Sequence, residues 1–206
     1  MSSELADLVA RVRALIDATV ATNAPAEVVN DAAAAVDRAV ALLQPHVPDP
    51  RPPRYPSVAS FQNPADLMPY DAVIGRLSPL APPIELECLA DRVRARVRFG
   101  TPYEGPPGCV HGGILALAFD QVFNVANLMQ GKAGPTIELT MRFRKPTPLD
   151  ADLVFEAWVA DHDDRRVTSK GHLLHGDVVT VEAQGTFAPL SSDRVMRLLD
   201  RRKPSS

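Results

Sequence analysis

The sequence predicts an α+β fold in which a curved antiparallel sheet covers one long apolar helix. Nearly every position of residues 114–129 is apolar, which is typical of a helix buried on all sides. Four segments in which polar and apolar residues alternate follow that helix, and such alternation is typical of half-buried strands. Two further helical patterns at the N-terminus predict an αα-hairpin extension.

The hairpin is expected within residues 1–44. Apolar residues recur at helical spacing over residues 5–16, behind Ser2 and Ser3, which can cap a helix. Pro25 suits the first turn of a second helix, whose apolar stripe covers residues 28–43. The hairpin is either a lid or oligomer contact, or an accessory packing element.

A linker follows at residues 45–56, where six prolines prevent a helix or an interior strand. The remaining residues, 57–206, are expected to form the functional domain, with a short terminal helix at residues 191–202. Two of its strands are expected as a hairpin within residues 84–99, in which glutamates of the first strand face arginines of the second. The expected register pairs Glu85 with Arg96 and Glu87 with Arg94, each ion pair worth about 0.2–1 kcal/mol.

The four strands after the central helix are expected at residues 136–144, 153–160, 166–175 and 178–187. In the first of these, the residues expected to face the helix are Ile137, Leu139, Met141 and Phe143. Pro146 and Pro148 end that strand. A sheet built from these strands must curve strongly in order to cover one helix.

The composition excludes several classes of function. The chain has 22 basic and 25 acidic side chains without a long block of like charge, so no nucleic-acid partner is expected. Cys88 and Cys109 are too few for a disulfide scaffold, and no cluster has metal-ligand spacing, so we expect neither a metal nor another cofactor. No basic leader is present and no apolar run approaches the ~20 residues of a membrane span, which predicts a cytoplasmic protein without one.

The segment His111-Gly112-Gly113 opens the central helix. The two glycines remove side chains where unpaired backbone N–H groups point outward and the helix dipole is positive. In thioester hydrolysis, negative charge develops on the carbonyl oxygen. A donor placed to meet that charge is typically worth about 2.7–4 kcal/mol, so this segment is a candidate binding site for the oxyanion.

Asp120 begins a polar stripe on the same helix, with Gln121, Asn124 and Asn127. A carboxylate among apolar residues is costly unless it is hydrogen-bonded, paired or used. Asp120 is therefore either catalytic or held structurally by Asn124 and Gln121. His111 lies nine residues before it, about 13.5 Å along the helix and on its opposite side. A site that uses both residues predicts a two-fold dimer with two interfacial sites.

These residues resemble the hotdog-fold acyl-CoA thioesterases, in particular the branch of the phenylacetate-pathway and mammalian thioesterase-superfamily members. The resemblance covers residues 84–188, and it rests on the His-Gly-Gly segment, on the aspartate nine residues after the histidine, and on Thr136 in Gly134-Pro-Thr. It implies the hotdog fold, an acyl-CoA substrate, a homodimer that can pair into a homotetramer, and a place in fatty acid metabolism.

The resemblance also implies residue roles. The Gly112 N–H would polarise the thioester carbonyl, and Asp120 of the other copy would act as nucleophile or as base for water. Thr136 would orient that aspartate or the water, and His111 would contribute through its backbone or its ring. Further substrate-binding candidates are Gly113, Glu104, Gln121, Asn124, Arg144 and Lys145.

Alternative roles remain for Glu104 and for the pair Arg144 and Lys145. Several relatives carry an asparagine six residues before the histidine, where this chain has Gly105, while Glu104-Gly-Pro-Pro-Gly resembles the long-chain acyl-CoA branch. The role of that asparagine is either absent or carried by Glu104. Arg144 and Lys145 either bind coenzyme A phosphates or form an ordinary solvated strand end.

Three functions remain open at this point. The first is hydrolysis of an acyl-CoA to free acid and CoA. The second is an enoyl-CoA hydratase or dehydratase, in which His111 and Asp120 would transfer protons. The third is a non-catalytic acyl-CoA-binding dimer, which Gly105 favours. Release of free thiol from a saturated acyl-CoA distinguishes the first from the others.

Overall fold

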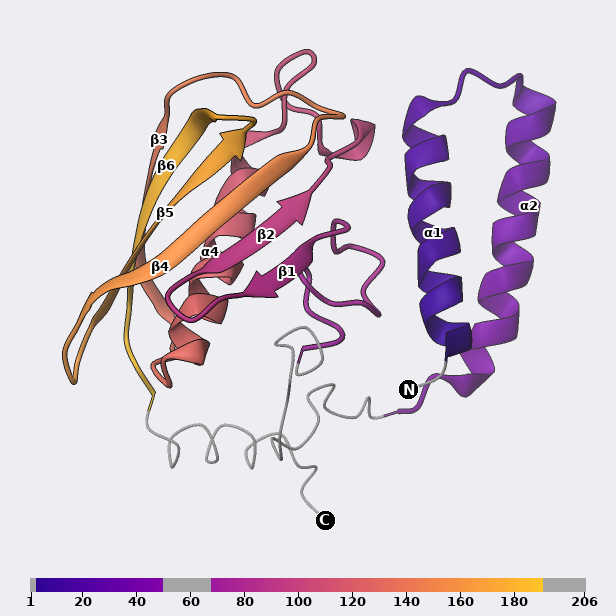
Figure 1. The fold of residues 1–206 in the computed structure, drawn as a ribbon. Helices are drawn as coiled ribbons and strands as arrows, with labels where there is room; N and C mark the ends of the chain where they lie inside the picture. The colour runs from indigo at the N-terminus through magenta and orange to yellow at the C-terminus, as the bar shows by residue number, and fades with distance from the viewer. Residues whose placement is uncertain (1–2, 50–67, 191–206) are drawn as a thin grey trace.

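A computed structural model describes residues 3–49 and 68–190 of the chain. The helices are α1 (Ser3–Ala21), α2 (Ala26–Leu43) and α4 (Gly112–Met129), with short 3-10 helices η1 (Gln44–His46) and η2 (Thr101–Tyr103) (Figure 1). The strands are β1 (Glu85–Cys88), β2 (Val93–Val97), β3 (Thr136–Phe143), β4 (Leu153–His162), β5 (Val167–His175) and β6 (Val178–Phe187).

The strands form one antiparallel sheet in the order β1-β2-β4-β5-β6-β3. The spatial order differs from the chain order, because β3 crosses to the far edge beside β6 and leaves β2 to pair with β4. Helix α4 packs along one face of this sheet, and the α1–α2 hairpin stands beside the domain (Figure 1). The predicted α+β arrangement, with one helix covered by a sheet and an N-terminal hairpin, is confirmed.

Aromatic side chains fix α4 on the sheet. Phe119 meets Phe155 of β4 with ring centroids 4.9 Å apart, and Phe123 meets Phe187 of β6 at 6.2 Å. All four rings are fully buried, so replacing one by alanine would cost about 3–5 kcal/mol.

The length and hydropathy of α4 alone would allow this helix to cross a membrane, whereas the sequence analysis expected no membrane span. Its packing against the sheet is that of a core helix.

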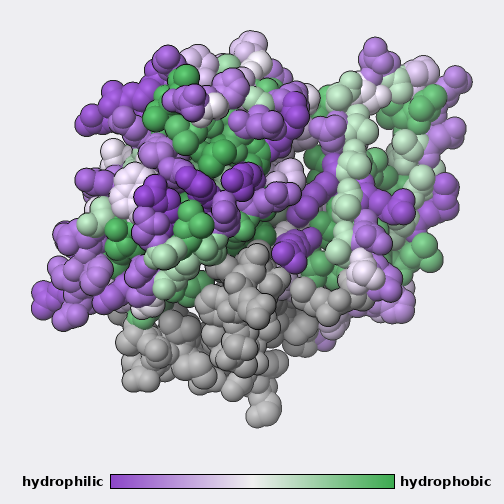
Figure 2. All heavy atoms as spheres, in the orientation of Figure 1, coloured by the Kyte–Doolittle hydropathy of each residue, from purple (hydrophilic) through white to green (hydrophobic). Residues whose placement is uncertain are grey.

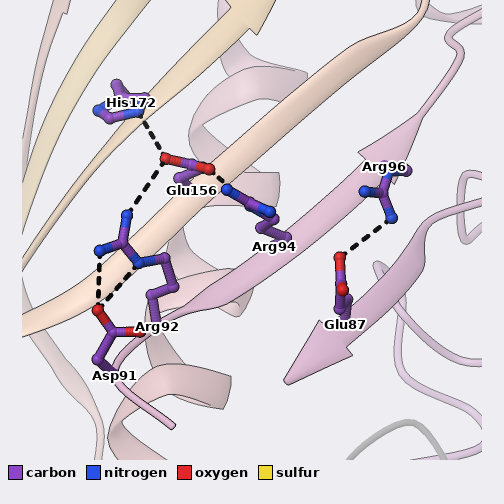
Figure 3. Close-up of polar contacts among 7 residues, drawn as sticks. All are labelled: Glu87, Asp91, Arg92, Arg94, Arg96, Glu156 and His172. Carbon is purple, nitrogen blue, oxygen red and sulfur yellow. Dashed lines mark hydrogen bonds and ion pairs between the residues drawn. The ribbon is translucent and has the colours of Figure 1, made fainter. Parts of the chain in front are cut away.

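The expected register of β1 and β2 is confirmed, since Glu85 lies opposite Arg96 and Glu87 opposite Arg94. The predicted ion pairs have the wrong partners. Arg96 reaches diagonally to Glu87, with Nη1 and Oε2 3.1 Å apart, whereas the Arg94 Nε donates to Glu156 of β4 at 2.7 Å (Figure 3). Glu156 is only 8% exposed, and a buried carboxylate needs a charged partner more than an exposed one does.

Strand β3 corrects a second expectation. Leu139 and Met141 pack against the core as predicted. Ile137 and Phe143, which were expected to face the helix in the interior, are 56% and 57% exposed. The reason is that β3 is an edge strand, so neither a neighbouring strand nor the helix covers its two ends. An edge with apolar side chains is suited to pairing with another chain.

Both helices of the predicted hairpin are present, but α2 has no buried residue. Its large exposed side chains are Val28, Val29, Val36, Val40, Leu42 and Leu43, and Figure 2 shows hydrophobic residues along the hairpin surface. Most of the proposed linker, its boundary with the domain at residue 57 and the terminal helix at residues 191–202 lie outside the described residues. The division into domains therefore stays a prediction.

Candidate active site

The start of α4 leaves one backbone donor free. The His111 ring caps the helix, because its Nδ1 accepts the N–H of Gly113 at 2.9 Å. The N–H groups of Ile114 and Leu115 donate to the His111 carbonyl at 3.0 and 3.2 Å. The Gly112 N–H has no acceptor among the residues that the structure describes. It therefore remains available at the positive end of the helix dipole.

Gly112 lines a pocket of about 470 Å³. The apolar part of the lining includes Cys109, Val110, Leu115 and Phe143, and Arg144 and Lys145 add positive charge. A β-carbon at Gly112 would lie 3.2 Å from the Cζ atom of Phe143. Glycine at this position therefore lets the Phe143 ring lie directly beside the free N–H.

The two cations of this pocket differ in what they contact. The Arg144 Nε and Nη2 atoms donate to Glu182 at 3.0 and 2.7 Å, and this hydrogen bond holds the pKa of Glu182 below its usual range. The Lys145 ammonium has no hydrogen bond or ion pair with a described residue. Of these two candidates for binding phosphate, Lys145 is thus the one with an unengaged charge.

Asp120 lies midway along α4, next to the start of β3. Thr136 donates its hydroxyl to the Asp120 Oδ1 atom at 2.5 Å, so the residue expected to orient Asp120 does contact it. The Oδ2 atom accepts no hydrogen bond from the described part of the chain. Asn124 donates instead to the backbone carbonyl of Asp120 at 3.2 Å. The alternative in which Asn124 holds the carboxylate is therefore wrong.

The other two residues of the predicted polar stripe, Gln121 and Asn127, contact other parts of the molecule. Gln121 donates to the sulfur of Met68 at 3.5 Å. Asn127 is fully buried against the sheet, where its Oδ1 accepts the hydroxyl of Ser169 at 2.6 Å. Neither amide contacts Asp120 through its side chain, so neither one explains the carboxylate.

The loop before α4 is closed by Glu104, whose Oε1 accepts the N–H of Gly108 at 2.7 Å. Gly108 has a φ of +73°, which favours glycine. A β-carbon at Gly105 would lie 2.7 Å from the His111 Cα atom. An asparagine at this position therefore has no room in the loop as it stands, and Glu104 has a structural role in the loop.

One chain does not bring the two halves of the predicted site together. The pocket beside Gly112 is lined by neither Asp120 nor Thr136. Strand β3 links them, since it begins at Thr136, beside Asp120, and ends at Phe143, beside Gly112. Sequence reasoning did not place Phe143 here, because the alternation pattern of this strand predicted that Phe143 is a core residue.

Tyr103 is a second contributor that the sequence did not indicate. Its carbonyl accepts the His111 N–H at 2.9 Å. Because a backbone atom makes this contact, no side-chain pattern could have identified it.

Comparison with known proteins identifies the family of the chain. The family model of the thioesterase superfamily matches residues 107–182. Acyl-coenzyme A thioesterase THEM5 of Homo sapiens is 29% identical over 93 residues, which are 44% of this chain. The chain spans only 38% of the length of that relative.

Solved structures extend the comparison. A hypothetical thioesterase of Streptococcus pneumoniae TIGR4, solved with coenzyme A, shares the fold at a TM-score of 0.50 and 17% identity, over 52% of this chain and 89% of its own. Alanine variants of that protein were also solved, one at an aspartate and one at a threonine sixteen positions later.

A more similar structure is that of the thioesterase superfamily protein RHA08564. It covers 91% of this chain and 92% of its own, with 33% sequence identity and a TM-score of 0.75. A match over 91% of the chain extends beyond the helix-and-sheet domain and includes at least part of the N-terminal hairpin. The chain therefore belongs to the thioesterase superfamily and has the hotdog fold.

Proposed function

We propose that the chain hydrolyses an acyl-CoA thioester to the free acid and CoA, at a site shared between two copies. The Gly112 N–H of one copy binds the carbonyl oxygen, and Asp120 of the other copy is the nucleophile or the general base for water. The observation that carries this proposal is the free N–H of Gly112, which lies beside the end of β3. The same strand begins beside Asp120.

The edge strand supports a shared site. An exposed strand edge can pair with the same strand of a second copy, and a two-fold axis makes that pairing antiparallel. The Thr136 end of one β3 then meets the Phe143 end of the other. Asp120 of one copy is thereby brought toward Gly112 of its partner, and the exposed side chains of Ile137 and Phe143 become buried.

The chemistry follows from these groups. When Asp120 acts as general base, its unengaged Oδ2 takes a proton from water while the water oxygen attacks the thioester carbon. The carbonyl oxygen gains negative charge, which the Gly112 N–H and the helix dipole stabilise. The carbon–sulfur bond then breaks, and CoA leaves as the thiolate. Lys145 is placed beside the pocket to attract the phosphates of CoA.

The relatives support the same assignment. THEM5 is named an acyl-coenzyme A thioesterase, and the S. pneumoniae structure contains coenzyme A. The aspartate and threonine that were replaced in that protein have the same spacing as Asp120 and Thr136. The hydratase alternative needs His111 for proton transfer, and the His111 Nδ1 atom is not available for it because it accepts the Gly113 N–H and caps α4.

The oxyanion role is tested by removing the Gly112 N–H. Proline is well tolerated at the first position of a helix, so Gly112→Pro deletes the donor and keeps α4, whereas Gly112→Ala adds a β-carbon and keeps the donor. We expect Gly112→Pro to lower kcat by about 10²–10³-fold, measured as free thiol released from a panel of saturated acyl-CoA esters. Gly112→Ala should lose far less. Equal loss in both variants would reject the role of the N–H.

Mixing two inactive variants tests the shared site. Asp120→Asn carries an intact Gly112, and Gly112→Pro carries an intact Asp120, so a mixed dimer contains one complete site only if the two residues come from different copies. With random exchange of subunits, activity should return to about one quarter of the wild-type value. No recovery in mixed dimers would show that the site lies within one chain.

A further inference from the structure

The N-terminal hairpin lies outside the predicted catalytic domain, yet α1 packs against η2, the short helix before the active-site loop. Only one residue of α1, Val9, is buried. A pocket of about 490 Å³ lies beside α1, lined on one side by Ile16 and on the other by Pro102 and Tyr103. Apolar packing between α1 and the domain is therefore incomplete, and polar contacts must fix how α1 is seated.

Arg13 makes those polar contacts. Its Nη2 atom donates to the carbonyls of Gly75 and Ser78 at 3.0 and 2.7 Å. Burial lowers the pKa of Arg13, and the nearby Tyr103 hydroxyl opposes that shift. The Nε atom is buried without a partner among the described residues. An unsatisfied buried donor costs free energy, so stability alone is a weak explanation for an arginine here.

Arg13 and Tyr103 line the same pocket between α1 and the domain, and a chain of contacts leads from Tyr103 to the free donor of the site. The Tyr103 ring is half-buried on the α1 side and packs edge-on against Phe99, with centroids 5.3 Å apart. The carbonyl of the same residue accepts the His111 N–H at 2.9 Å. His111 in turn caps α4 through its ring and its carbonyl. The position of η2 therefore sets the position of the first turn of α4.

We propose that Arg13 is a positioning residue: by tying α1 to the Gly75 and Ser78 carbonyls it keeps α1 packed on η2, and it thereby holds the Gly112 N–H in its reactive orientation. This inference rests on the proposed function for its effect on catalysis. The hairpin is then a brace for the active site and not a passive appendage. A displacement of about 1 Å at a catalytic group can lower a rate by up to about 10²-fold, so a remote tether can affect kcat.

The test compares Arg13→Ala, Arg13→Lys and Arg11→Ala in the full-length chain. Arg11 is an exposed arginine of the same helix and serves as the matched control. We expect Arg13→Ala to lower kcat about tenfold with KM changed less than about twofold. Arg13→Lys should recover most of that loss, because an ammonium can still donate to the two carbonyls, and Arg11→Ala should behave as wild type.

Amide hydrogen exchange gives a readout that does not depend on activity. Arg13→Ala should speed exchange in residues 112–115 and leave residues 122–126 of the same helix unchanged. A lower melting temperature with unchanged kcat and unchanged exchange would overturn the proposal, and so would a lower kcat without faster exchange at residues 112–115. If wild-type protein releases no thiol from any acyl-CoA, the proposed function fails, while the exchange experiment still decides whether Arg13 positions α4.

Discussion

At the scale of the residue, the hydrogen bonds at the start of α4 determine which backbone donor stays free. His111 uses its ring, its carbonyl and its N–H in hydrogen bonds, which leaves Gly112 as the free donor among the described residues of that turn. In the proposed mechanism, Gly112 therefore acts through its backbone N–H, and His111 acts by capping α4.

A substitution at Gly105 tests how tightly the loop before α4 is packed. Gly105→Asn would introduce the asparagine of other relatives, but its β-carbon would lie 2.7 Å from the His111 Cα atom. We expect the loop to shift, the free energy of unfolding to fall by about 1–3 kcal/mol, and kcat to fall with it. Thermal unfolding and thiol release measure the two effects. Higher activity in this variant would mean that the family role of the asparagine can be restored here.

Substitutions of Lys145 and Arg144, the two cations beside the pocket, can be compared directly. Lys145→Gln removes a charge with no partner among the described residues, whereas Arg144→Gln removes one already bound to Glu182. We expect Lys145→Gln to raise KM for acyl-CoA about fivefold, equivalent to about 1 kcal/mol, with little change for Arg144→Gln. The reverse order would assign the phosphate contact to Arg144.

At the scale of the element, the outer face of the sheet is held by a charge network centred on Glu156 of β4. Glu156 accepts from Arg94 at 2.7 Å and lies 3.1 Å from the Nε2 atom of His172 (Figure 3). Burial raises the pKa of Glu156, but the hydrogen bonds and charges of Arg94 and His172 outweigh burial and lower it. The network ties β2, β4 and β5 together.

Glu156→Gln should therefore lower the free energy of unfolding at neutral pH by about 1.5–3 kcal/mol. A carboxyl with a lowered folded-state pKa stabilises the fold above its ordinary pKa, and this contribution disappears as pH falls through the lowered value. Wild type and variant should thus converge in acid, which urea unfolding across pH can follow. Glu182→Gln, at an exposed arginine-paired glutamate on β6, is the control and should change stability much less.

Strand β3 carries the prediction for assembly. Ile137→Lys places a charge on the apolar edge that we propose as the dimer contact, so we expect dissociation to monomers and a loss of activity of about tenfold or more. Light scattering after size exclusion measures the mass. Leu80→Lys, at a residue that is 71% exposed in a loop, is the control. A fully active dimer of the Ile137 variant would rule out this edge as the interface.

At the scale of the whole molecule, a shared site makes activity depend on association. Activity per chain should fall when wild type is diluted below the dissociation constant of the dimer, and saturating ligand should oppose that fall by mass action. A dilution series of thiol release, with mass photometry at the same concentrations, checks this. Constant specific activity in a sample that has become monomeric would contradict the proposal.

The sequence by itself predicted the main helices and strands that the described residues form and the β1–β2 register, and the family resemblance implied that Thr136 orients Asp120 or the water. Periodicity reports which side of an element is apolar, and the family motif reports spacing along the chain, so both are readable locally. Only the tertiary structure decided the strand order, which put β3 at an edge and left Ile137 and Phe143 exposed. It also decided the partner of Arg94, the role of Glu104 in the loop, and the seating of α1 by Arg13. These features depend on which distant segments become neighbours, and local patterns carry no information about that choice.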